Sequence, residues 1–141
     1  MLTIMREGDN EIYEFEVERR EVPKQTVSYE MLENKIAYIR ISEFDKVTVD
    51  QFTDAMATAK GSEMLGLILD LRDNPGGNLA AVIDVARKLL PKGLIVYTED
   101  KAGERTDYTC NGENELTVPM VVLVNGGSAS ASEVLAGAIK D

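Results

Sequence analysis

Two short runs with strand-like patterning open the chain, at residues 2–6 and 12–17. In the second run, Tyr13, Phe15 and Val17 share one face, because side chains alternate between the two faces of a strand. Turn-forming residues separate the runs, so the pattern predicts a β-hairpin. A lone hairpin is only marginally stable in water, and we therefore expect it to pack against another part of the molecule.

From residue 36 onward, apolar runs of strand length alternate with segments whose apolar residues recur at the helical period. The run at 65–71 is almost continuously apolar, which is typical of a strand buried on both faces. This alternation predicts an α/β fold with a mostly parallel sheet and flanking helices. The predicted strands are 36–41, 65–71, 94–98 and 120–124, and the predicted helices are 48–60, 79–90 and 134–140.

Local signals refine three of these segments. Thr48 and Gln51 have the spacing of a capping box, and Gly61 is well placed to end the first helix. In the second helix, the apolar period puts Leu79 on the buried face. The polar, glycine-containing stretch 99–118 is expected to form a hairpin or a long loop.

Charge and length narrow the class of protein. The chain has 141 residues, about one domain, with 25 acidic residues against 15 basic ones and a formal net charge of −10. So acidic a surface repels phosphate backbones, and we predict no nucleic-acid partner. No apolar run approaches the ~20 residues that span a bilayer, and the start lacks the features of a signal peptide. Either the protein is cytosolic or its targeting segment lies outside this sequence.

The chain contains no histidine and a single cysteine, Cys110. These counts exclude Ser-His-Asp and Cys-His catalysis, histidine-type zinc sites, thiolate metal clusters and an internal disulfide. A hydrolytic nucleophile here must be activated by a lysine, a carboxylate, a chain-terminal amine or a bound metal. Because no base is evident beside it, Cys110 is predicted to be an inert thiol.

Two turns with small residues each follow a predicted strand and lead into a predicted helix, at 74–77 and 128–133. In open α/β sheets ligands bind beyond the carboxyl ends of the strands, where the unpaired N–H groups of helix starts attract negative charge. The first turn, Asn-Pro-Gly-Gly, is equally well explained as a tight connection. In the second, a nucleophilic role for Ser130 competes with a capping box that it forms with Glu133.

A cluster of charged residues precedes the first of these turns. Asp70, Arg72 and Asp73 raise the possibility of a metal site or an acid pair. Alternate side chains of a strand point in opposite directions, so we favour an internal ion pair that involves Arg72.

The sequences at 66–77 (Gly-Leu-Ile-Leu-Asp-Leu-Arg-Asp-Asn-Pro-Gly-Gly), at 122–125 (Val-Leu-Val-Asn) and at 128–133 (Ser-Ala-Ser-Ala-Ser-Glu) closely resemble the carboxy-terminal processing proteases. These are the tail-specific serine peptidases of family S41, whose core is similar to the crotonase and Clp protease folds. The strand at 36–41 followed by Phe44 is similar to the one that opens that core. The resemblance covers nearly the whole chain.

The resemblance implies that Ser130 is the nucleophile, because it is the middle serine of the family motif. It also implies that the backbone N–H groups of Ala131 and Gly76 bind the oxyanion and that a lysine is the general base. That lysine lies beyond this chain in the family. Lys140 lies about 15 Å along the helix that starts at Ser130, too far to replace it. No metal or organic cofactor is implied.

On the same resemblance, residues 1–25 are the C-terminal strands of a PDZ domain with a linker, and residues 26–141 are an incomplete peptidase core. The parent protein is expected to cleave protein substrates near their C-termini through an acyl-enzyme, and to work outside the cytoplasmic membrane. The chain itself, without the lysine, is expected to be inactive.

Two other functions remain open. One is a catalytically silent module that binds peptides or proteins, and the other is a crotonase-like acyl-CoA enzyme with the same kind of oxyanion hole. An interrupted sheet with an open edge or apolar face also favours self-association into a homo-oligomer.

Overall fold

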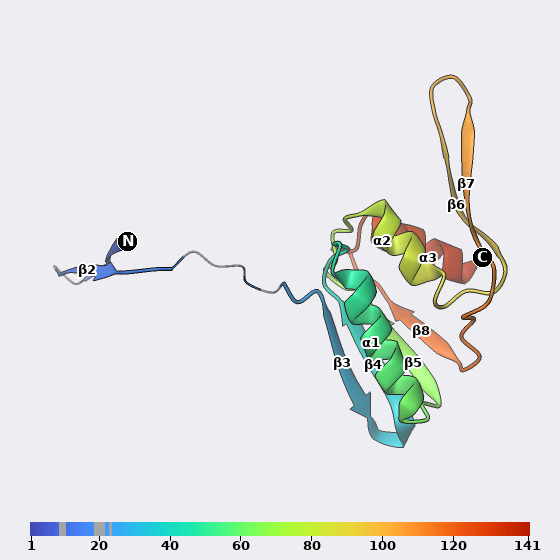
Figure 1. Cartoon of the computed structure of the whole chain (residues 1–141), viewed down its shortest axis with the longest axis horizontal. Coiled ribbons are helices and arrows are strands. Elements are labelled where there is room, and N and C mark those ends of the chain that lie inside the picture. The colour runs from blue at the N-terminus through green and yellow to red at the C-terminus, as the bar shows by residue number, and fades with distance from the viewer. Residues whose placement is uncertain (9–10, 19–21, 23) are drawn as a thin grey trace.

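The computed structural model describes residues 1–8, 11–18, 22 and 24–141. A strand-rich N-terminal part is followed by segments in which strands and helices alternate (Figure 1). The elements are β1 (Leu2–Met5), β2 (Ile12–Phe15), β3 (Val27–Leu32), a 3-10 turn (Glu33–Lys35), β4 (Ile36–Ile41), α1 (Thr48–Gly61), β5 (Gly66–Asp70), α2 (Leu79–Ala86), β6 (Gly93–Glu99), β7 (Arg105–Cys110), β8 (Met120–Leu123) and α3 (Ala131–Lys140).

A four-stranded sheet with the order β3-β4-β5-β8 forms the centre of the fold. The pairs β4–β5 and β5–β8 are parallel, which confirms the α/β class and the parallel centre of the sheet. The edge strand β3 was not predicted, and it pairs with β4 in the antiparallel sense. Its signal was present in the sequence, because Val27, Tyr29 and Met31 alternate with more polar residues.

The hydrophobic core lies on one face of this sheet. On β4, Ala37, Ile39 and Ile41 are fully buried, whereas the side chains between them, Tyr38 and Arg40, are only half-buried. The apolar stripe of α1 packs on the buried face, and α2 contacts both α1 and α3. Buried core residues of the helices include Phe52, Met56, Ala59, Val82, Val85 and Leu135.

The predicted capping box at the start of α1 is wrong. Val47 is the N-cap residue, and Gln51 Oε1 instead accepts hydrogen bonds from the backbone N–H groups of Thr26 (2.9 Å) and Val27 (3.1 Å). Gln51 therefore satisfies donors at the start of the edge strand β3, a tertiary use that its spacing in the sequence does not reveal. The helix ends at Gly61, as predicted.

The strand predicted at 94–98 exists as β6, but it lies outside the parallel sheet. It pairs with β7 in an antiparallel hairpin, hereafter the β6–β7 arm, which projects from the body of the molecule (Figure 1). The physical reason is that β6 has little burial, with Leu94 and Tyr97 each 49% exposed. The stretch 99–118, expected to form a hairpin or a long loop, instead supplies the turn and the second strand (β7) of this arm and then the connection to β8. Helix α2 is shorter than predicted, and Leu79 lies on its exposed side.

Strands β1 and β2 form the predicted N-terminal hairpin, with Leu2 opposite Phe15. Residues 9 and 10 of its turn lie outside the described residues. The described residues of the hairpin do not show the expected packing, since Leu2, Met5 and Ile12 are all more than half exposed, and Figure 1 shows the hairpin apart from the core.

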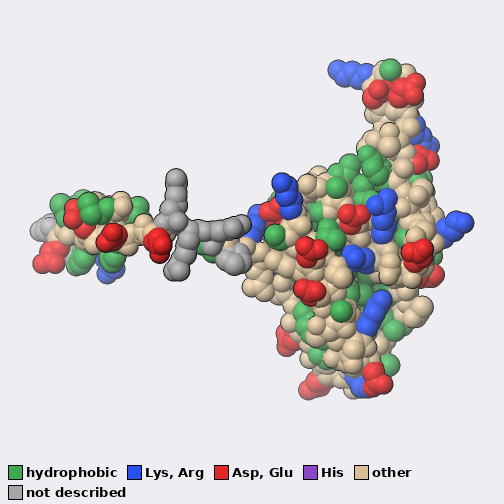
Figure 2. Space-filling view, in the orientation of Figure 1, with side chains coloured by type: hydrophobic (Ala, Val, Ile, Leu, Met, Phe, Trp, Pro, Cys, Tyr) green, Lys and Arg blue, Asp and Glu red, His purple; other side chains and the backbone are tan. Residues whose placement is uncertain are grey.

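Acidic and basic side chains are interspersed over the visible face of the molecule (Figure 2). Within the described residues, no helix combines the length and the apolar character needed to cross a membrane.

Candidate active site

The two turns singled out in the sequence meet at one end of the sheet. Because β5 and β8 are parallel neighbours, the segments that follow them leave the sheet side by side and lead into α2 and α3. A Cβ atom on Gly76 would lie 2.7 Å from the carbonyl oxygen of Ala129, 2.8 Å from Ser130 Cβ and 2.9 Å from the nitrogen of Ala131. The structure thus brings together Ser130, Gly76 and Ala131, the three residues assigned by resemblance.

Ser130 is an exposed residue with a strained backbone. It is the N-cap of α3 and has φ +52° and ψ −114°, a backbone conformation that residues other than glycine rarely adopt. Such a conformation costs about 1–3 kcal/mol and persists only where the surrounding structure enforces it. Glu133 contributes by accepting a hydrogen bond from the Ser130 N–H at 2.7 Å. The carboxylate predicted as a capping partner therefore helps to hold this conformation.

The backbone N–H groups of Gly76, Gly77 and Ala131, which lie on the two turns, differ in their partners. Within the described part of the chain, the N–H groups of Ala131 and Gly77 have no acceptor. Ala131 is a buried residue and the first of α3, a position where the backbone N–H has no acceptor within the helix. The N–H of Gly76 does have an acceptor, Asn74 Oδ1 at 2.8 Å. The donor that the resemblance assigned to Gly76 is therefore already engaged.

Asn74 forms an inner connection between the two turns and is fully buried. Its carboxamide donates to the carbonyl oxygen of Ile41 at 2.9 Å and accepts from Gly76. Its backbone carbonyl accepts from the Ala129 N–H and from Ser132 Oγ, both at 3.0 Å. Sequence analysis missed this residue, because Asn-Pro-Gly-Gly was considered only for its glycines.

An outer connection runs between Asp73 and Asn125. The Asp73 N–H donates to Asn125 Oδ1, and Asn125 Nδ2 donates to Asp73 Oδ1, both at 2.9 Å. Ser128 Oγ adds a bond of 2.8 Å to the carbonyl oxygen of Leu71 at the end of β5. Ser128 and Ser132 are thus anchors of the turn that carries Ser130.

Asp70 and Arg72 form the predicted ion pair. Arg72 contacts the buried Asp70 carboxylate through Nε at 2.9 Å and through Nη2 at 2.7 Å, and Tyr38 donates its hydroxyl to the same group. The Arg72 guanidinium holds the pKa of Asp70 well below its usual range. The hydrogen bond to Asp70 raises the pKa of Tyr38. Across the described residues, no cluster of three or more carboxylate or thiol ligands suited to a metal ion is present.

No hydrogen bond or ion pair joins a lysine to Ser130 in the described part of the chain. Lys24 bonds to Glu43 and Asp45, and these contacts raise its pKa, the opposite of what a general base needs. Lys140 is exposed at the far end of α3 from Ser130.

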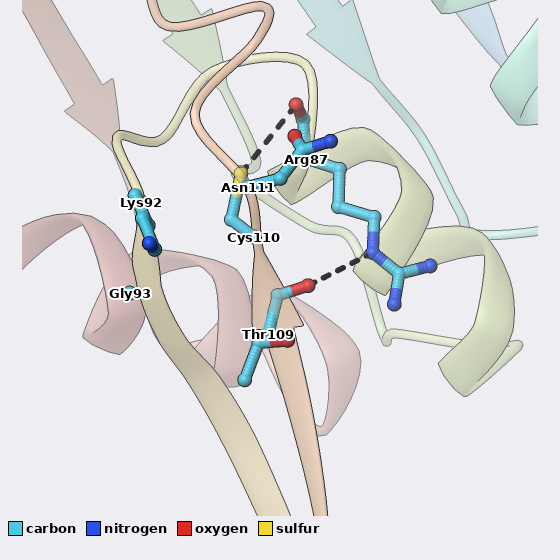
Figure 3. Close-up of a pocket in the computed structure, with 6 residues that line it drawn as sticks. All are labelled: Arg87, Lys92, Gly93, Thr109, Cys110 and Asn111. Atoms are coloured by element: carbon cyan, nitrogen blue, oxygen red, sulfur yellow. Dashed lines mark hydrogen bonds between the residues drawn. The ribbon is translucent and has the colours of Figure 1, made fainter.

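Cys110 lies at the end of β7, away from both turns in the sequence, and it lines a pocket with Arg87, Lys92 and Thr109 (Figure 3). Its side chain is buried and lies 3.2 Å from the carbonyl oxygen of Leu90. At the edge of the pocket, Arg87 Nε donates a hydrogen bond of 3.1 Å to the Thr109 carbonyl oxygen. The pocket contains neither of the two turns, and a buried thiol bonded to a carbonyl agrees with the predicted inert role.

Comparisons with known proteins fit this geometry. The family model of peptidase family S41 matches residues 35–141. A carboxyl-terminal-processing protease of Synechocystis sp. is 40% identical over 144 residues, covering 99% of this chain and 34% of that protein. A carboxy-terminal processing protease of Bacillus subtilis is 36% identical over 141 residues, covering 99% of this chain and 30% of that protein. The chain thus spans about a third of the length of these relatives.

A solved structure agrees in fold as well as in sequence. The photosystem II D1 C-terminal processing protease superposes with a TM-score of 0.75 at 34% identity, over 87% of this chain and 36% of that one. Residues 35–141, which the family model matches, include both turns, β5 and β8 of the central sheet, and α3. The chain therefore belongs to peptidase family S41, among the carboxy-terminal processing proteases.

Proposed function

We propose that the protein containing this chain is a serine peptidase in which Ser130 is the nucleophile. Ser130 Oγ attacks the carbonyl carbon of a peptide bond, the amine leaves with a proton, and water then hydrolyses the acyl-enzyme. The observation that carries this proposal is the strained, exposed Ser130 beside the unpaired N–H of Ala131. A hydrogen-bond donor that is fixed before the reaction at a helix start is suited to a developing oxyanion.

The second oxyanion donor comes from the turn at 76–77. The resemblance assigns it to Gly76, but the Gly76 N–H bonds to Asn74 while the adjacent Gly77 N–H has no acceptor in the described structure. We therefore favour the Gly77 N–H as the group that binds the oxyanion together with Ala131. Loss of one such donor typically lowers kcat by about 10²–10³-fold.

The general base is a lysine supplied by sequence outside residues 1–141. The chain has no histidine, and none of its described lysines contacts Ser130. Burial lowers the pKa of a lysine and lets the neutral amine accept the hydroxyl proton. Residues 1–141 alone are expected to be inactive.

The substrates are polypeptides that are cut near their C-termini, as the names of the relatives state for those proteins. Residues 1–25 belong to a PDZ domain that selects the substrate, and residues 26–141 to a core of the crotonase and Clp protease type. We place the parent outside the cytoplasmic membrane, without a cofactor or nucleic-acid partner. The exposed apolar side chains of the N-terminal hairpin favour a homo-oligomer.

The test is cleavage of an unstructured peptide by the complete gene product, followed by mass spectrometry of the fragments. Ser130→Ala should abolish turnover, and a fluorophosphonate should label Ser130 in the unsubstituted protein. Ser62→Ala, at the exposed C-terminal end of α1, is the matched control and should leave turnover unchanged. Retained turnover in Ser130→Ala, or a label on another serine, would refute the proposal.

One observation favours a second function. Ser130 has no lysine partner among the described residues, as expected of a module that holds peptides without cutting them. Peptide binding by the complete gene product without any cleavage would identify this non-catalytic function.

A further inference from the structure

We propose that Asn74 is a positioning residue that fixes the two turns of the active site relative to each other. Its carboxamide oxygen accepts a hydrogen bond from the Gly76 N–H, which leaves the Gly77 N–H as the donor for the oxyanion. Its backbone carbonyl accepts hydrogen bonds from the turn that carries Ser130. The inference deepens the proposed function and rests on it.

The carboxamide of Asn74 connects its own turn to the central sheet. Nδ2 donates to the carbonyl oxygen of Ile41, the last residue of β4, and Oδ1 accepts from the Gly76 N–H. A carbonyl on one side and an N–H on the other allow only one orientation of the amide group. Because the side chain is 0% exposed, water cannot replace either bond.

The backbone carbonyl of Asn74 holds the nucleophile from both sides. It accepts from the Ala129 N–H, one residue before Ser130, and from Ser132 Oγ, two residues after it. Both distances are 3.0 Å, and Ser132 is also fully buried. A single oxygen therefore constrains the segment on which Ser130 has its strained backbone.

Asn74 thus sets the separation between the nucleophile and the oxyanion donors. The two turns approach each other closely here, because a Cβ atom on Gly76 would lie within 3 Å of the Ser130 segment. Misplacement of a reacting group by about 1 Å can lower a rate by about 10²-fold. Loss of the Asn74 contacts should therefore lower kcat and leave substrate binding largely intact.

The first experiment uses Asn74→Asp in the complete gene product. At pH 8 the carboxylate directs an oxygen, in place of the Nδ2 donor, at the Ile41 carbonyl, and kcat should fall about 100-fold with KM within about 3-fold. When the carboxyl is protonated at lower pH it donates to Ile41 again, and burial raises its pKa toward neutrality. The ratio of mutant to unsubstituted kcat should therefore rise as the pH falls.

Thr26→Val is the matched control for lost stability. Thr26 is 1% exposed, and its hydroxyl bonds to Thr48 Oγ1 at 2.8 Å, on the α1 side of the sheet. This variant should lower the melting temperature but keep kcat at every pH. A kcat for Asn74→Asp no lower than that of Thr26→Val, or a ratio independent of pH, would overturn the inference.

If Asn74→Asp does not fold, Ser132→Ala tests the positioning role of Asn74 instead. It removes one oxygen atom and the bond to the Asn74 carbonyl, so kcat should fall about 10-fold with KM unchanged; an unchanged kcat would overturn the inference. The proposed function fails separately, if Ser130→Ala still cleaves the peptide. An inactive Ser130→Ala together with normal kcat in the Asn74 and Ser132 variants would refute only the positioning role.

Discussion

Gly76→Ala is a substitution that tests directly how closely the two turns of the candidate site approach each other. Gly76 has φ +101°, where a residue with a Cβ atom is strained by about 1–2 kcal/mol. The new atom would also meet Ala129, Ser130 and Ala131 at 2.7–2.9 Å. Two of these contacts are to backbone atoms, which cannot rotate away, and such overpacking costs about 1–3 kcal/mol. We expect the free energy of unfolding to fall by about 2–5 kcal/mol.

The assay is urea denaturation followed by circular dichroism, with two glycine controls. Gly103 has φ +85° and no atom within 4 Å of its Cβ position, so Gly103→Ala isolates the backbone strain. Gly137 lies inside α3 with equally open surroundings, and Gly137→Ala should stabilise the chain by up to about 1 kcal/mol. If Gly76→Ala costs no more than Gly103→Ala, the close approach of the two turns is wrong.

Three further predictions concern other parts of the molecule. Ser130→Gly should raise the free energy of unfolding by about 1 kcal/mol, because glycine relieves the backbone strain at φ +52°. The same variant should abolish cleavage by the complete gene product. If urea denaturation shows the variant to be less stable, Ser130 is not strained. Arg72 lowers the pKa of Asp70, so the stability from this pair is present above the ordinary aspartate pKa of 3.8 and is lost as the pH falls through the lower value in the folded state. At pH 7, Asp70→Asn should therefore have a free energy of unfolding about 1–3 kcal/mol lower than that of the unsubstituted chain. In acid-denaturation curves this difference in stability should narrow below pH 4. A difference independent of pH would refute the role of the ion pair. Cys110 should react with a thiol reagent only after denaturant is added, and rapid labelling of the native chain would contradict its burial.

The elements that were predicted correctly have strong local signals. The apolar run of β5 and the helical period around Phe52 reflect burial that the residues themselves specify. The placement of β6 was wrong because its apolar residues suit a strand in the sheet as well as one in a hairpin. Only the choice of pairing partner separates the two, and that choice depends on distant segments.

The same limit applies to the candidate site. The motif identified Ser130 and the glycine turn, but the partners of Asn74 are Ile41 and residues of the serine turn, far away in the sequence. An asparagine before a proline is explained equally well by a simple turn. Its connecting role, like the tertiary role of Gln51, becomes visible only when the strands are assembled.

The hydrogen bonds between the two turns have a consequence for how the molecule matures. Ser128 bonds to Leu71 and Ser132 to Asn74 across 57 and 58 positions of the chain. Closing so long a loop is entropically costly, and non-local strand pairing of this kind is slow. A nascent chain that has been synthesised only as far as β5 does not yet contain Ser130 or either of the serines that fix its turn to β5 and Asn74. The turn that carries Ser130 is therefore held in place only after β8 has paired with β5, late in the synthesis of this chain.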